Sequence, residues 1–319
     1  MQDDSDSISN FSDSEFDLTA TDIVLQVPFA PPVVQVPLAP TTATTTFSTT
    51  MTKAQLDQHC KNQGLTYSGG SKDVLVQSLE LRKDELNDRI RRTQDGLVLF
   101  ASDPGSIAAA WCLLFVPPLR MRITAESSPF TLVASGVEHF GPSRTHSIFA
   151  TKVKLMIANA WSQLPREYRH FQRVCLVESA SLRRQHFGIP PGIQGNYDCA
   201  LLLIGVLVAD KLAYGGRHDD VVESVDPLKI SALFDLEATS AQKAAIKTTN
   251  DLSKAAAIRL IKKGNAVRRV ESLREEGGLA IDNAALEILN IHDVCDAILM
   301  GLGWFQFARA TFEASGNPI

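Results

Sequence analysis

Apolar residues between positions 97 and 309 fall into runs of two kinds, and each kind predicts one type of element. Short, nearly continuous apolar runs bounded by turn residues predict buried strands; these runs cover 97–102, 108–115, 119–124, 131–137, 173–179 and 221–225. Longer runs predict helices over 145–164, 197–213 and 291–309, and a long basic helical region precedes the last of them. Because strands come first and then alternate with helices, the sequence predicts an α/β domain whose mixed sheet is flanked by helices.

The first 50 residues have no such pattern. They begin acidic and Ser-rich and continue Pro-rich and Thr-rich, a composition that cannot bury a core, so we expect a disordered tail over 1–50. Within the tail, LQVPFAP and VQVPLAP repeat nine residues apart. Such a repeat can serve as a docking peptide for a protein partner, and an unstructured spacer is the alternative.

Helical patterning returns over residues 51–92. Leu56 and Cys60 fall one turn apart, Gly64 ends the first helix, and apolar residues from Val74 onward restart a 3.6-residue period. The predicted organisation is therefore a tail over 1–50, a helical module with its connector over 51–92, and a main domain over 96–312.

The distribution of charge and of cysteines indicates the cellular compartment in which we expect the protein. The net charge is −5, yet the first 50 residues hold seven acidic residues and no Lys or Arg, which leaves 31 basic against 29 acidic residues elsewhere. Five widely spread cysteines without a C-x-x-C pair suit reduced thiols inside a cell. The acidic N-terminus disfavours a secretory signal and mitochondrial import, so we expect a cytoplasmic or nuclear protein, a site of viral replication included. The longest apolar run, 200–209, is about half of a membrane span, so no membrane partner is expected.

Four carboxylates occupy positions that such a domain can bring together. Asp103 and Glu178 each follow an apolar strand, and sites in open α/β sheets form at the carboxyl ends of strands. Asp103 lies in Asp-Pro-Gly, which by itself is a common turn. Asp293 and Asp296 are three apart in a mostly apolar helix and therefore point the same way. Buried like charges need a positive partner, and Mg²⁺ with its preference for oxygen ligands is the economical one.

The order of these elements resembles the RNase H-like Holliday-junction resolvases, a family with bacterial RuvC-type, mitochondrial and poxviral branches. The matching features are a strand followed by Asp-Pro-Gly-Ser at 103–106, a strand ending at Glu178, and Asp-x-x-Asp-Ala at 293–297 on the last helix. The resemblance covers about residues 96–310 and implies an RNase H-like fold and a homodimer that nicks four-way DNA junctions symmetrically. It also implies two Mg²⁺ ions, with Mn²⁺ as a substitute, held by the catalytic carboxylates Asp103, Glu178, Asp293 and Asp296.

One detail departs from that family. Its members often carry Gln or Arg directly after the strand-end Glu, whereas Ser179 and Ala180 follow Glu178 here. Arg183 and Arg184 arrive later, so no sequence preference at the cut is inferred.

Residues 51–92 resemble the SAP family, a small helix-extended-helix module that binds DNA. The matching features are the leucine of the first helix, Gly64-Leu65, Ser68-Gly69 and Lys72. The family usually has Ser-Gly-x-Lys, and here one extra residue separates Gly69 from Lys72. A generic helical hairpin is the alternative.

Basic residues cluster between Lys243 and Arg274, where nine Lys and Arg residues face two acidic ones. Such a surface favours DNA, because binding releases counterions from phosphates, and a solvated helix face is the alternative. The residues expected to contact DNA are Lys72, Arg183, Arg184, Lys229, Lys254, Lys262, Lys263, Arg268 and Arg269.

The sequence thus favours a Mg²⁺-dependent, structure-selective endonuclease that resolves four-way junctions by paired nicks, with branched DNA and a second copy of the chain as partners. Two alternatives stay open. One is an RNase H-like nuclease acting on hybrids or flaps, and the other is a non-catalytic SAP-type scaffold that binds DNA. The presence of all four carboxylates argues against the scaffold.

Overall fold

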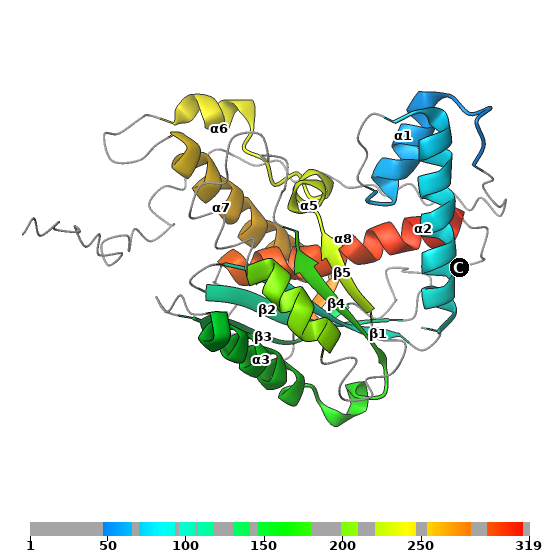
Figure 1. The fold of residues 1–319 in the computed structure, drawn as a ribbon. Coiled ribbons are helices and arrows are strands. Elements are labelled where there is room, and N and C mark those ends of the chain that lie inside the picture. Colours follow the sequence, from blue (N-terminus) through cyan, green and yellow to red (C-terminus); the bar gives the residue numbers. More distant parts are fainter. Residues whose placement is uncertain are drawn as a thin grey trace, which may run out of the picture. The chain divides into compact units, whose positions relative to one another are not determined.

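The computed structural model describes residues 47–65, 70–92, 96–105, 108–117, 130–140, 146–179, 199–209, 221–246, 254–281 and 292–314 (Figure 1). All of them belong to the compact unit Pro40–Ile319. The disordered tail expected over 1–50 falls almost wholly outside these residues, as do the strand expected over 119–124 and the two arginines Arg183 and Arg184.

A six-stranded mixed sheet forms the centre of the described structure, in the order β5-β4-β1-β2-β3-β6. Its strands are β1 (Leu97–Pro104), β2 (Ala108–Val116), β3 (Phe130–His139), β4 (Gln172–Glu178), β5 (Val221–Val225) and β6 (Leu279–Ile281). The first three strands are antiparallel neighbours, β4 runs parallel to β1, and β5 runs parallel to β4. The predicted α/β fold with a mixed sheet is therefore confirmed.

The central strand β1 shows why its sequence is almost continuously apolar. Successive side chains of a strand point to opposite faces. Leu97, Leu99 and Ala101 enter the core on one face of the sheet, while Val98 and Phe100 enter the core on the other. Both faces are covered, so neither set of positions can be polar.

Two groups of helices provide that cover (Figure 1). One face of the sheet packs against α5 (Pro227–Leu233), α7 (Lys254–Glu275) and α8 (His292–Ala314). The other packs against α3 (His146–Ser162) and the helical residues 199–209. The remaining short elements are η2 (Arg166–Tyr168) and α6 (Ser240–Ala245). Of the helices that the structure describes, none combines the length and apolar character needed to cross a bilayer.

The helix α8 lies close to the sheet and extends further than the sequence pattern indicates. A Cβ atom at Gly301 would lie 2.6 Å from the Leu114 side chain on β2, so a glycine permits this close approach. The predicted helix over 291–309 continues to Ala314, because its last turns are not exposed but pack against the N-terminal helices.

Those N-terminal helices form a hairpin of α1 (Lys53–Asn62) and α2 (Lys72–Arg92). Thr52 and Gln55 form a capping box that starts α1, and Gly64, with φ of +67°, ends it. A small core closes the hairpin, formed by Phe47, Leu56, Cys60, Leu75 and Leu79. The helical hairpin expected over 51–92 is present; its assignment to the SAP family stays a prediction.

Candidate active site

Asp103 and Glu178 lie at the same end of two adjacent parallel strands. The last paired residues of β1 and β4 are Ser102 and Val177, and each acid follows directly. Their side chains are hydrogen-bonded to each other. This bond acts to raise the pKa of Glu178 and to lower that of Asp103, although burial raises both pKa values overall.

The helix α8 brings the other two acids to the same place. Asp293 and Asp296 lie in its first two turns, where α8 crosses the sheet. One carboxylate oxygen from each of Asp103, Asp293 and Asp296 lies within 4.8 Å of the other two. Glu178 is outside this triangle but touches Asp103 and is close enough to feel the charge of Asp296. All four carboxylates predicted from the sequence therefore meet at one edge of the sheet.

Their environment disfavours the charged forms. Burial, followed by the nearby charge of Asp293, raises the pKa of Asp103 to about 6. Burial, followed by the charges of Asp103 and Asp293, raises the pKa of Asp296 to about 7. The pKa of Glu178 is raised well above its usual value, by burial first and then by Asp103 and Asp296. The site thus concentrates negative charge that a cation would relieve.

The helix α7 supplies cations to the same site. Lys263 Nζ lies 2.7 Å from Asp293 Oδ1, and Lys262 Nζ lies 2.7 Å from Glu237 Oε1. Both lysine charges lower the pKa of Asp296, though not enough to offset burial and the neighbouring acids. Lys263, expected from the sequence to contact DNA, therefore pairs with one of the acids.

A cavity of about 230 Å³ opens between these elements. Its lining combines acids, basic residues of α7 and mainly apolar residues of α5 and its surroundings. The lining residues are Asp103, Glu178, Asp296, Arg259, Lys262, Lys263, Pro227, Ile230, Ser231, Leu236 and Met300.

Arg259 is a lining residue that the sequence prediction left out of the DNA-contacting set. The signal was present in the sequence: Arg259, Lys262 and Lys263 follow an i, i+3, i+4 pattern, which places them on one face of a helix. The count of basic residues between Lys243 and Arg274 does not show this pattern, because it ignores their spacing.

The other residues expected to contact DNA are placed in different surroundings. Lys254 is exposed at the start of α7, and Arg268 is partly buried in the same helix. Arg269 lies over the Phe234 ring at 5.9 Å and 3.6 Å from Glu276.

Two expected DNA contacts lie at the N-terminal hairpin. Lys72 Nζ donates to the Thr49 carbonyl at 3.2 Å. Lys229 Nζ donates to the Gly64 carbonyl. Their roles in DNA binding stay predictions.

Comparison with known proteins adds likenesses of structure. The sequence matches no family model and no curated protein. Among solved structures, the crystal structure of the yeast mitochondrial Holliday junction resolvase Ydc2 is similar, with 16% identity and a TM-score of 0.45 over 81% of this chain and 94% of that one. The structure of T. thermophilus RuvC in complex with a Holliday junction substrate has 11% identity and a TM-score of 0.29 over 55% of this chain and 96% of that one.

Proposed function

We propose that this chain is a divalent-metal-dependent DNA endonuclease, and that within this class it resolves four-way junctions. The observation that carries the proposal is the meeting of Asp103, Glu178, Asp293 and Asp296 beside one cavity, which Arg259 and the two lysines of α7 also line. Acids with raised pKa values and cationic side chains line the same cavity, which suits a substrate that brings phosphates and a cofactor that brings positive charge.

The acids fit a hard divalent cation. They offer only oxygen ligands, three of them already lie within 4.8 Å of one another, and the donors come from three different elements of a rigid sheet and helix. Asp103, Asp293 and Asp296 would hold one ion, and Glu178 with Asp103 and Asp296 would complete a second position. When bound, Mg²⁺ or Mn²⁺ supplies a Lewis acid that polarises the phosphodiester and favours ionisation of a water.

The protein's own residues do the remaining work. Lys262 and Arg259 line the cavity and bind the phosphates on either side of the scissile bond. Ile230, Leu236 and Met300 form an apolar wall that excludes bulk water and packs against sugar or base. The exposed Lys254 extends the basic face of α7 beyond the cavity and follows the backbone of the DNA arm.

Paired nicks require two sites, and the molecule has a surface suited to a second copy. Ile148 and Leu155 on α3 are 46% and 56% exposed, and Leu201 and Val208 on the helix over 199–209 are 50% and 40% exposed. Each pair is seven residues apart, hence on one helical face, and both helices cover the same side of the sheet. We propose that this apolar face forms a twofold homodimer.

Cleavage of defined substrates tests the proposal. The full chain is incubated with labelled four-way junction, RNA–DNA hybrid and flap, in Mg²⁺, in Mn²⁺ and with chelator. We expect metal-dependent, symmetric nicking of the junction in preference to the other two substrates. Asp103→Asn should lower the cleavage rate at least about 100-fold while junction binding persists. The matched control is Asp235→Asn, since Asp235 is exposed and its φ of 52° is one that Asn also adopts.

Three results would overturn parts of this account. Cleavage that persists in chelator would contradict the metal dependence. A normal cleavage rate in Asp103→Asn would contradict the assignment of the active site. Faster cleavage of the hybrid or the flap than of the junction would mean that one of those two is the substrate.

A further inference from the structure

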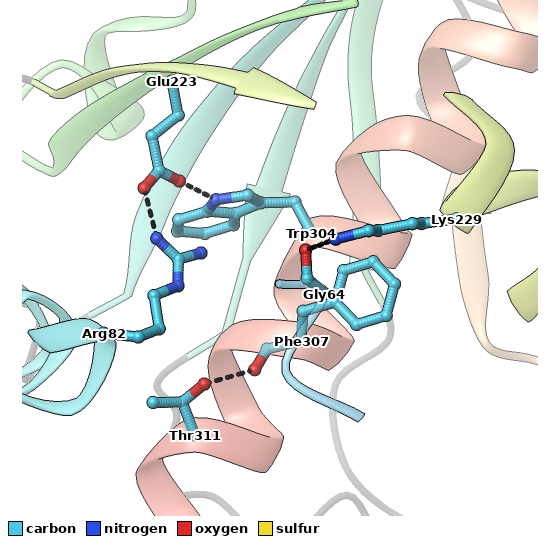
Figure 2. Close-up of polar contacts among 7 residues, drawn as sticks. All are labelled: Gly64, Arg82, Glu223, Lys229, Trp304, Phe307 and Thr311. Carbon is cyan, nitrogen blue, oxygen red and sulfur yellow. Dashed lines mark hydrogen bonds and ion pairs between the residues drawn. The ribbon is translucent and has the colours of Figure 1, made fainter. Parts of the chain in front are cut away.

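The N-terminal hairpin is joined to the sheet domain by a buried polar contact (Figure 2). Arg82 Nη1 on α2 lies 2.8 Å from Glu223 Oε1 on β5, and these side chains are 15% and 13% exposed. Trp304 Nε1 on α8 donates to the second oxygen of Glu223. One carboxylate therefore ties together a helix of the hairpin, a strand and the helix that carries Asp293 and Asp296.

A second contact joins the end of α1 to α5 and α8 (Figure 2). Lys229 Nζ on α5 donates to the Gly64 carbonyl. A Cβ atom at Gly64 would lie 2.6 Å from the Phe307 ring, so the residue that ends α1 rests directly on α8. The hairpin thus makes two specific contacts with the sheet domain, in addition to its packing against the end of α8.

Both contacts lead to the carboxylate cavity over a short distance. Ile230 and Ser231, the two residues after Lys229, line the cavity. Glu223 lies two residues before Val225, which pairs with Glu178 across β4 and β5. Ser179 N and Oγ bond the Val225 carbonyl at 2.8 and 3.1 Å, which fixes the chain just after Glu178.

The elements that receive the contacts are short. In the described sheet β5 is an edge strand of five residues, bonded to β4 on one side. The helix α5 has seven residues and is held against α8 by a close approach, since a Cβ at Gly303 would lie 2.5 Å from Ile230 Cδ1. Without the Arg82 cation, the partly buried charge of Glu223 would disfavour the present position of β5.

We propose that the hairpin is a positioning element of the active site. Arg82, Glu223 and Lys229 are positioning residues: they hold β5 and α5 in the places that set Glu178 and the cavity wall. The cleavage and Mn²⁺ readouts of this inference rest on the proposed function, whereas its hydrogen-exchange readout does not. The competing account makes the hairpin an arm that contributes DNA affinity alone.

Three measurements on the full chain separate these accounts. Lys229→Met and Arg82→Met keep most of each apolar stem and remove the charge. Lys61→Met is the matched control, because Lys61 is an exposed lysine of the same hairpin. The readouts are Mn²⁺ affinity without DNA, hydrogen exchange of the backbone amides over 225–236, and kcat and KM on the junction.

We expect both test variants to bind Mn²⁺ about tenfold more weakly, in the range seen when residues behind metal ligands are replaced. Amides over 225–236 should exchange faster, and kcat should fall about tenfold with KM changed less than about twofold. Lys61→Met should match the wild type in all three. Thermal melts identify a variant that has lost its fold, and the other variant then carries the test.

The failures are distinguishable. Wild-type Mn²⁺ affinity and wild-type exchange in both variants overturn the inference and leave the nuclease proposal standing. A change confined to KM or to DNA affinity overturns it in favour of the DNA arm. If the wild type itself binds no Mn²⁺, the proposed function fails, and the exchange data alone decide whether the hairpin positions β5 and α5.

Discussion

The helix α8 meets carboxylates at two places, and the two places treat charge in opposite ways. Near its middle, at Trp304, the helix meets Glu223, and Trp304 and the Arg82 guanidinium bond both oxygens of that carboxylate. In its first turns, Asp293 and Asp296 join Asp103 and Glu178, with raised pKa values for three of the four acids. Glu223 is matched by protein partners, whereas burial and neighbouring acids raise the pKa values of Asp103, Glu178 and Asp296, and under the proposed function the four acids would bind a cation.

The largest expected effect comes from a substitution in the first turns of α8. Asp296→Asn should lower cleavage at least about 100-fold, because it removes a ligand oxygen's charge. The same change should raise the free energy of unfolding of the metal-free protein by about 1 kcal/mol or more, because a buried like charge is removed. Urea denaturation with chelator measures this, with Asp235→Asn as control. Destabilisation by Asp296→Asn would contradict the account.

The next effect is a loss of stability, and it tests the contact between α8 and Glu223. Glu223→Gln keeps the shape but removes the charge that Arg82 faces, so it should lower the free energy of unfolding by about 2–3 kcal/mol. The same urea experiment measures it. If Glu223→Gln and Asp296→Asn shift the free energy of unfolding in the same direction, the Glu223 contact and the four-acid site do not differ as described.

The pH dependence of stability should also distinguish the four-acid site from the Glu223 contact. The raised pKa values of Asp103, about 6, and Asp296, about 7, mean that the folded state holds more protons than the unfolded state between about pH 4 and 7. The contribution of these groups to stability is therefore present at low pH and is lost as pH rises through that window.

Thermal melts of the metal-free protein give the check. Their midpoint should fall between about pH 5 and 8 more in the wild type than in Asp296→Asn, and Mg²⁺ should restore more stability at the higher pH. Equal pH profiles for the two proteins would contradict the raised pKa of Asp296.

The smallest effect concerns the exposed basic face. Lys254→Gln should weaken junction binding only about two- to threefold and lower the salt slope of the affinity by about one, with no change in kcat. Fluorescence anisotropy across a salt series measures it. An unchanged salt slope would remove Lys254 from the DNA-contacting set.

Much of the site could be predicted from the sequence because its signals are local. An apolar run that ends in an acid predicts a strand-end carboxylate, as at Asp103 and Glu178, and a spacing of three on a helix predicts a shared face, as at Asp293 and Asp296. The structure places all four together. Their role as metal ligands stays a prediction until it is measured.

The contacts that were not predicted depend on partners far apart in sequence. Arg82 and Glu223 are 141 positions apart, and Lys229 and Gly64 are 165 apart. A lone lysine near a site looks the same in sequence whether it contacts a phosphate or a carbonyl, so the sequence predicts a DNA contact for Lys229 but does not show its bond to the Gly64 carbonyl. The pairing of Lys263 with Asp293 was missed for the same reason.

Direct titration of the full chain with Mn²⁺, followed by electron paramagnetic resonance near pH 8, tests the central claim most directly. The account predicts two ions per chain, competed by Mg²⁺, and loss of binding in Asp103→Asn but not in Asp235→Asn. A wild-type chain that leaves all added Mn²⁺ free, or an Asp103→Asn chain that binds it as the wild type does, would contradict the assignment of the four acids.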